Sequence, residues 1–291
     1  MKLNIHIIKK RVFKLISQIL ENQYSLFIIL MIITAFPVGF FAGLFGIGGG
    51  LITVPFLFFI FSSLDIDPNY VMHLAVGTSF SIIIPTSFVS VYTHNKHGAV
   101  DLQIIKSYAI FVIIGVIVGT SLASILKTKG LILFFTVVVY FLSIYLLFLK
   151  EKAQDTKTNF NLLPKIIFGF ISGFVSAPMG IGGAVMNVPI LKYFGFPINK
   201  AIGSAAAIGF FIALFGAIGF LISGSYLKAS LPLSIGFINV PALLIFIPIT
   251  TFMARVGANA VHKIEKTKIT KFFGMFLVVV GTIFLYRYLN I

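Results

Sequence analysis

Long apolar runs follow one another through this chain and are separated by short polar breaks. Eight such runs stand out along the sequence. They cover approximately residues 24–61, 70–93, 102–126, 130–149, 163–194, 198–222, 228–257 and 269–289. Because about 20 apolar residues in a helix span the hydrocarbon core of a bilayer, most of these runs match one crossing. The pattern predicts an all-α, polytopic helical membrane protein.

Two of the runs, 24–61 and 163–194, are too long for one continuous helix, and both contain a cluster of glycines. The clusters are Gly46-Ile47-Gly48-Gly49-Gly50 and Gly180-Ile181-Gly182-Gly183. Glycine allows many backbone conformations and so weakens a helix. Lipid cannot form hydrogen bonds with the backbone N–H and C=O groups that a break sets free. Each cluster therefore predicts a glycine-broken helix, either discontinuous or re-entrant, whose broken part is buried in protein.

The two halves of the chain share further motifs in the same order, which favours an internal duplication. Gly39 to Gly43 (GFFAG) matches Gly169 to Gly173 (GFISG), and Ala75 to Ser79 (AVGTS) matches Ala201 to Ala205 (AIGSA). Chance recurrence of glycine in apolar sequence is the alternative explanation. The predicted organisation is a basic amphipathic segment 1–23, a repeat of about four spans at 24–149, a polar linker 150–162 and a second repeat at 163–291.

Composition and charge placement agree with a bilayer environment. The 291 residues are 59% hydrophobic and 10% charged, with mean hydropathy +1.09 and a formal net charge of +15. The lysines and arginines sit between the apolar runs and at their ends, where they set orientation and meet anionic headgroups. A nucleic-acid binder would display them on a soluble face. The expected partner is the lipid bilayer, and no nucleic acid is expected.

The placement of ionisable residues narrows the chemistry. No acidic residue falls inside an apolar run, so neither a carboxylate proton relay nor a carboxylate cation site is predicted. The acids are Glu21, Asp65, Asp67, Asp101, Glu151, Asp155 and Glu265. The chain has no cysteine, no G-x-S-x-G and no H-E-x-x-H. We therefore expect no enzyme activity, no cofactor and no metal site.

An anion, in contrast, needs only dipoles and hydrogen-bond donors. The half-helix after each glycine cluster begins with free N–H groups and the positive end of its dipole, which is a ready anion site. The predicted substrate-binding residues are Gly46, Gly48, Gly49, Gly50, Thr53, Thr78, Ser79, Gly180, Gly182, Gly183, Asn187 and Ser204. Close helix packing by the glycines and back-bonding of the hydroxyls within their own helices are the alternatives.

Two ionisable residues are secondary candidates. Arg255 could supply a positive charge at the mouth of the site, although an arginine that snorkels at a helix end is the favoured interpretation. His73 could carry a proton, although its place at the start of run 70–93 favours an interfacial position.

The motif residues resemble those of the TauE/SafE sulfite exporter family, also called the toluene sulfonate uptake permease family. The resemblance rests on Gly43 to Pro55 (GLFGIGGGLITVP), Gly180 to Pro189 (GIGGAVMNVP) and Ala75 to Ser79. It implies an inner-membrane anion permease built by duplication of a four-span unit, with sulfite, sulfonates and related organosulfur anions as substrates. Ala184 and Asn187 stand where the first copy has Gly50 and Thr53, so the halves are not equivalent.

The predicted function is transport of a small anion by alternating access around the two breaks. An anion channel with a glycine-lined filter is one alternative. A non-transporting membrane assembly partner is another, and a homo-oligomer is left open.

Overall fold

The computed structural model describes residues 23–45, 49–64, 66–148, 160–227, 231–260 and 266–290. Segment 1–23 therefore lies outside the described residues except for Gln23, as do residues 150–159 of the predicted linker. The helices are α2 (Gln23–Phe45), α3 (Gly50–Ser62), α4 (Val71–Lys96), α5 (Leu102–Ile125), α6 (Thr128–Phe148), α7 (Leu162–Met179), α8 (Ala184–Tyr193), α9 (Ile198–Tyr226), α10 (Val240–Ala260) and α11 (Lys266–Asn290). Helix dominates the described chain, which confirms the all-α prediction.

Eight of the described helices are long and apolar enough to cross a membrane, namely α2, α4, α5, α6, α7, α9, α10 and α11. Helices α3 and α8 are shorter, with 13 and 10 residues. Run 163–194 thus contains two helices, as does run 24–61. Run 228–257 differs from expectation because its helix begins only at Val240. Before it, β1 (Ser234–Ile235) and β2 (Ile238–Asn239) form an antiparallel hairpin that turns at Gly236, whose φ is 56°.

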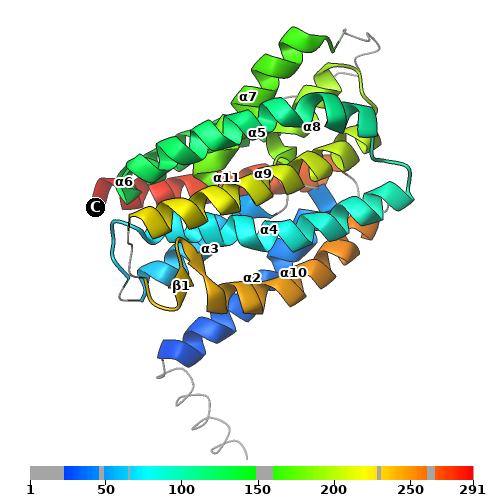
Figure 1. Ribbon diagram of the computed structural model, residues 1–291. Coiled ribbons are helices and arrows are strands. Elements are labelled where there is room, and N and C mark those ends of the chain that lie inside the picture. Colours follow the sequence, from blue (N-terminus) through cyan, green and yellow to red (C-terminus); the bar gives the residue numbers. More distant parts are fainter. Residues whose placement is uncertain are drawn as a thin grey trace, which may run out of the picture.

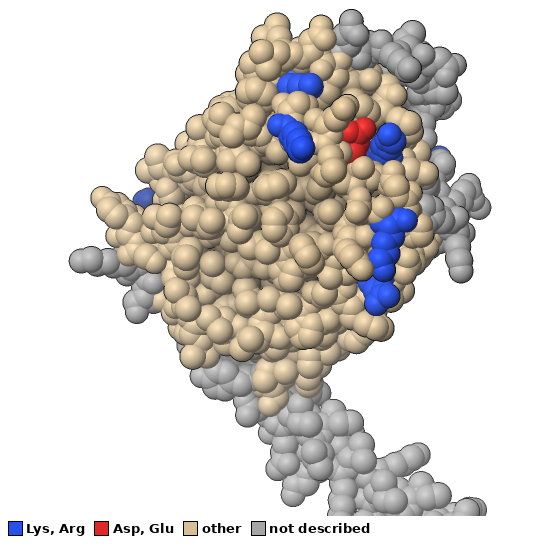
Figure 2. Space-filling model, turned by 45° about the vertical axis from the view of Figure 1, so that its right-hand side comes forward, with Lys and Arg blue, Asp and Glu red and all other residues tan. Residues whose placement is uncertain are grey.

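The outer surface is suited to lipid. Large apolar side chains stand exposed along the outer helices, among them Phe141 and Phe148 on α6 and Phe272, Met275 and Val279 on α11. Figure 2 shows a face that is almost entirely uncharged, with its few charged side chains toward one side. In water such continuous apolar surface would be an aggregation liability, whereas the hydrocarbon core of a bilayer accommodates it.

Helices α4 and α9 lie side by side through the middle of the molecule, with α5 on one side and α10 on the other (Figure 1). The two central helices are antiparallel. Gly77 near the start of α4 lies against Phe220 near the end of α9, and farther along Phe80 lies against Gly216. The ring centroids of Phe88 and Phe210 are 6.4 Å apart.

Glycines bring two further helix pairs into backbone contact. A Cβ at Gly43 of α2 would overlap the carbonyl of Ala254 in α10, and a Cβ at Gly173 of α7 would overlap the carbonyl of Val112 in α5. Small residues allow such close approach where helices have no hydrophobic drive to associate. Within each pair the contacts advance together along the sequence, since Gly39 meets Thr250. Helices α2 and α10 are therefore parallel, and so are α5 and α7.

Hydroxyls near the starts of the central helices fix the starts of their neighbours. The backbone N–H of Asn239 donates to Thr78 Oγ1 at 2.9 Å, and the Asn239 side chain accepts from the N–H of Ala242 to cap α10. In the same way the N–H of Asp101 donates to Ser204 Oγ at 2.9 Å, while the Asp101 carboxylate caps α5. Each bond therefore holds in place the N-cap residue of the neighbouring helix.

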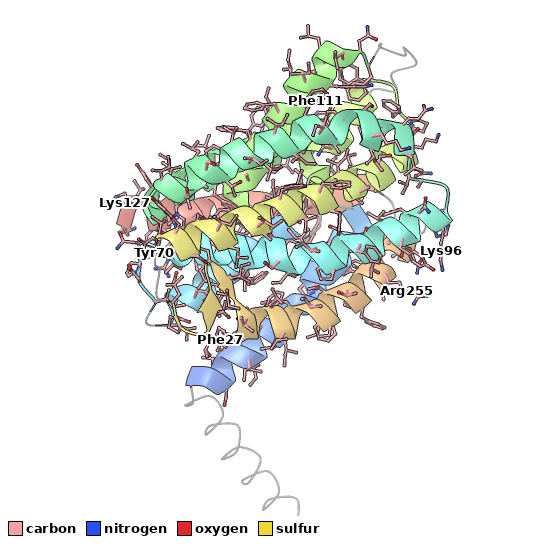
Figure 3. All side chains as sticks on the ribbon, in the orientation of Figure 1. Phe27, Tyr70, Lys96, Phe111, Lys127 and Arg255 are labelled. Atoms are coloured by element: carbon pink, nitrogen blue, oxygen red, sulfur yellow. The ribbon has the colours of Figure 1, made fainter. Side chains whose placement is uncertain are left out.

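These contacts set the direction of every central helix. Helix α10 starts beside the start of α4, and α5 starts beside the start of α9. Because α4 and α9 are antiparallel, α2, α4 and α10 run one way and α5, α7 and α9 run the other way. Tyr70 and Lys127 mark one end of the bundle, and Lys96 and Arg255 mark the other end (Figure 3).

The glycine contacts predict a local cost for added side chains. Gly173→Ala places a methyl group on the Val112 carbonyl, so we expect a loss of about 1–3 kcal/mol in stability. Gly130→Ala is the control, because its Cβ would meet only Leu126 at an ordinary 3.5 Å. Thermal unfolding of the purified protein in detergent should show a lower Tm for Gly173→Ala alone. Equal Tm values would contradict the packing described for α5 and α7.

Candidate functional site

The first break lies between α2 and α3. Gly46 and Gly48 lie outside the described residues, whereas Gly49 has φ 81° and precedes the first residue of α3. Its carbonyl accepts from the N–H groups of Ile52 and Thr53, both at 2.9 Å. A left-handed conformation of this kind favours glycine, because a Cβ there is strained. The local sequence therefore starts a new helix at Gly50.

The second break separates α7 from α8. Gly180 has φ 64° and ends α7, with its N–H directed to the carbonyl of Ala177 at 3.3 Å. The N–H of Ile181 donates to the carbonyl of Ser176 at 3.3 Å, which gives the pair of bonds of a Schellman-type helix end. After Gly183, helix α8 begins at Ala184.

The two breaks lie against each other in the interior. A Cβ at Gly50 would overlap the carbonyl oxygen of Gly180, so the first turn of α3 rests on the backbone that leads toward α8. Ser79 of α4 donates its hydroxyl to the same Gly180 carbonyl at 2.9 Å. Gly180 itself is closed in by Val54 and Val76. The fold thus brings together Gly49, Gly50, Ser79 and Gly180, which belong to opposite halves of the sequence.

Asn187 lies in the first turn of α8 and is fully buried. Its amide nitrogen donates to the carbonyl of Gly183 at 2.6 Å, and its amide oxygen accepts from the hydroxyl of Tyr108 at 2.8 Å. Gly182 and Gly183 lie against Gly209 of α9. The second glycine cluster is therefore tied to α5 through Tyr108 and packed on α9.

Three polar residues at this place were not predicted from the sequence. Tyr108 of α5 is fully buried, as are Ser172 and Ser176 of α7. Ser172 lies close to the Tyr108 hydroxyl, and Ser176 follows one turn later on the same face of α7. Neither serine hydroxyl makes a hydrogen bond of ordinary geometry within the described chain. The available signal was two serines one turn apart just before a glycine cluster.

The other predicted hydroxyls have different surroundings. Thr53 donates to the carbonyl of Gly49 at 3.0 Å, which is the back-bonded alternative. Thr78 and Ser204 hold the capping residues of α10 and α5, so these hydrogen bonds lie at those helix starts and not at the glycine breaks. In the sequence, Thr78 follows Gly77 and Ser204 follows Gly203. That proximity alone could not tell whether the hydroxyls lie at a glycine break or at the start of a neighbouring helix.

The secondary candidates also differ in placement. Arg255 is exposed at the same end of the bundle as Lys96 (Figure 3), as expected of a snorkelling helix-end arginine. His73 is buried within the protein, with only 1% of its surface exposed. Its Nε2 lies 3.1 Å from the carbonyl oxygen of Ala123, and its ring packs 5.0 Å from that of Phe237. Phe237 of the hairpin therefore covers the imidazole inside the protein.

The side chains around the two breaks are neutral. Ser79, Tyr108, Ser172, Ser176 and Asn187 offer hydroxyl and amide groups to this region. Among the described residues the carboxylates are Asp67, in the loop before α4, and Asp101, the cap of α5. Hydrogen-bond donors together with helix N-termini can hold a negative charge, whereas a cation would find no charged ligand at these positions.

Comparison with known proteins defines the class and then the family. The chain is 33% identical to a probable membrane transporter protein of Haemophilus influenzae, over 88% of this chain and 97% of that protein. A probable membrane transporter protein of Methanocaldococcus jannaschii is 31% identical over 84% and 91%, respectively. No solved structure gives a significant match. With eight apolar spans, the chain is an integral membrane protein of the transporter class.

The family follows from the model that matches residues 31–284, described as sulfite exporter TauE/SafE. The chain belongs to the TauE/SafE family, as its glycine motifs indicated. The match spans both glycine clusters.

The bond between Ser79 and Gly180 predicts a measurable contribution to stability. Ser79→Ala leaves a buried carbonyl without this donor, so we expect a loss of about 1–3 kcal/mol. Ser81→Ala is the matched control, because the Ser81 hydroxyl only donates to Gly77 within its own helix. Denaturant or thermal unfolding of both variants measures the difference. Equal effects of the two substitutions would contradict a special role for the Ser79 bond.

Proposed function

We propose that the chain is a carrier built from two inverted repeats that moves small sulfur oxyanions by alternating access. The first half comprises α2 to α6 and the second half comprises α7 to α11. Helices α2, α4 and α10 run opposite to α7, α9 and α5, which are their counterparts in order. Inverted repeats of this kind characterise many secondary transporters, whose substrate sites lie where the repeats meet.

The helix contacts relate the two halves in the same way, because each helix packs as its counterpart in the other half does. Helix α2 packs on α10 as α7 packs on α5, and α4 packs on α10 as α9 packs on α5. The central pair α4 and α9 and the outer pair α6 and α11 each join a helix to its own counterpart. The bonds of Thr78 to Asn239 and of Ser204 to Asp101 are counterparts too. One duplication explains all of these pairings at once.

The observation that carries the proposed site is the meeting of the two breaks. Gly50 at the start of α3 lies on the backbone of Gly180 and Ile181, which leads into α8. The N-termini of two short helices therefore face the interior from opposite halves, with neutral donors beside them. Free N–H groups and positive dipole ends stabilise an oxyanion without a charged side chain. We assign substrate binding to this junction.

The substrate class follows from that chemistry together with the family. Sulfite, sulfonates and related organosulfur anions present several acceptor oxygens to a ring of donors, and the family model is named for sulfite export. Rocking of one half against the other would open the junction to each side in turn. The bacterial or archaeal inner membrane is the compartment that relatives from such organisms suggest.

Flux into proteoliposomes tests the function directly. The purified protein should move sulfite or thiosulfate with a rate that saturates as the anion concentration rises. Non-saturating single-channel currents would instead identify the anion channel. Absence of protein-dependent flux for sulfite, thiosulfate and sulfonates alike would overturn the proposal and leave the assembly-partner alternative.

A glycine substitution tests the junction. Gly50→Ala inserts a methyl group against the Gly180 carbonyl, so the two breaks must separate. Displacements of about 1 Å in a binding site can lower rates by about 100-fold, and we expect at least about a tenfold loss of flux. Gly130→Ala controls for the added methyl group at a glycine with room for it. Wild-type flux in a folded Gly50→Ala protein would remove the junction from the substrate path.

A further inference from the structure

We infer that the anion is held on one side of the junction, by a cluster of neutral donors in the second half that we call the hydroxyl cluster. The cluster consists of Tyr108 on α5, Ser172 and Ser176 on α7 and Asn187 at the N-terminus of α8. This inference rests on the proposed transport function and names the residues and the size of substrate that the site takes.

Ser172 and Ser176 differ from most of the buried helical hydroxyls among the described residues. A serine or threonine within a helix usually donates to the carbonyl one turn back. The buried residues that do so include Thr34, Thr53, Ser81, Thr86, Thr93, Thr136 and Thr250. Ser172 and Ser176 are fully buried and make no such bond. Their donor capacity is left for another acceptor.

Tyr108 and Asn187 join these serines to a helix N-terminus. Ser172 lies close to the Tyr108 hydroxyl, which donates to Asn187 Oδ1 at 2.8 Å. Asn187 uses one amide hydrogen for the Gly183 carbonyl, and the second amide hydrogen is not needed for that bond. Hydroxyls from α5 and α7 therefore gather where α8 begins. An oxyanion there would accept from the two serines and from the second amide hydrogen of Asn187, with the α8 dipole behind it.

The first half lacks this set of donors. Gly39 lies against Thr250 as Gly169 lies against Tyr108, so Thr250 takes the place of the tyrosine. Thr250 donates to Phe246 and Thr53, the counterpart of Asn187, donates to Gly49. Ala42 stands in the motif position of Ser172 and carries no donor at all. The two halves share a fold, but only the second half carries the hydroxyl cluster.

The surroundings of the cluster limit the size of the anion. All four residues have no exposed surface, and the Phe160 ring lies 5.4 Å from that of Tyr108. The Phe194 ring in turn lies 4.5 Å from that of Phe160, tilted by 39°. Such an enclosure suits a compact anion whose oxygens surround one sulfur, as in sulfite and thiosulfate. It disfavours an aryl sulfonate, whose ring would have to displace this aromatic cover.

Binding to the purified full-length protein tests the cluster without requiring flux. Thiosulfate should raise the Tm of the wild type in detergent, and its titration gives a dissociation constant. Ser172→Ala and Ser176→Ala should each weaken binding by at least about tenfold, the usual effect of losing a hydrogen bond to a charged group. Ser176→Ala should keep the wild-type Tm without anion, because the Ser176 hydroxyl makes no hydrogen bond within the described chain. A serine with only a structural role would lower that Tm.

Ser90→Ala is the matched control, since Ser90 is another buried helical serine whose hydroxyl lacks a partner. Wild-type affinity in Ser172→Ala and Ser176→Ala, or equal weakening in Ser90→Ala, would overturn the cluster. Equal stabilisation by toluenesulfonate would overturn the size limit. If these variants bind normally while the wild type transports, the proposed function survives alone. If the wild type neither binds nor transports sulfite or thiosulfate, both inferences fail.

Discussion

A helix that breaks inside a membrane sets free backbone groups that lipid cannot bind, and this fold depends on how those groups are covered. Each break here is covered by the other. Gly50 has no Cβ, so α3 can rest directly on the carbonyl of Gly180. The Ser79 hydroxyl donates a hydrogen bond to the same carbonyl. Gly49 and Gly180 both have positive φ, a conformation that favours glycine at each break. Bulk at any of these points would separate the halves where they meet.

The same principle extends outward from the centre. Gly43 and Gly173 bring α2 onto α10 and α7 onto α5 at backbone distance, because a Cβ at either glycine would overlap a carbonyl of the facing helix. Side-chain hydroxyls then set the longitudinal positions, because Thr78 and Ser204 hold the residues that cap α10 and α5. It is costly to leave a polar group unpaired in a low-dielectric interior. These hydrogen bonds therefore fix where each helix begins relative to its neighbour. The lipid-facing helices α6 and α11 pack on each other outside this frame.

The spans, the family and the neutral character of the breaks could be predicted from sequence, because hydropathy and local glycine clusters are short-range signals. Contacts between residues that are far apart in the sequence could not be predicted in this way. Tyr108 and Asn187 are 79 residues apart, and nothing local to either one names the other. Thr78 and Ser79 are adjacent, yet a helix directs neighbouring side chains to different faces, so Thr78 holds the residue that caps α10 while Ser79 donates to Gly180. Likewise, the apolar character of residues 231–239 concealed a hairpin whose turn depends on Gly236.

The crossed anchoring of capping residues has a consequence for the origin of the chain. The start of α10 is held by Thr78 of the first half, and the start of α5 is held by Ser204 of the second half. A half on its own would lack the hydroxyl that anchors its own crossing helix. If both halves descend from a single ancestral gene, that ancestor needed a second copy inserted into the bilayer upside down. Fusion would then have made permanent a pairing between two opposite orientations of one polypeptide.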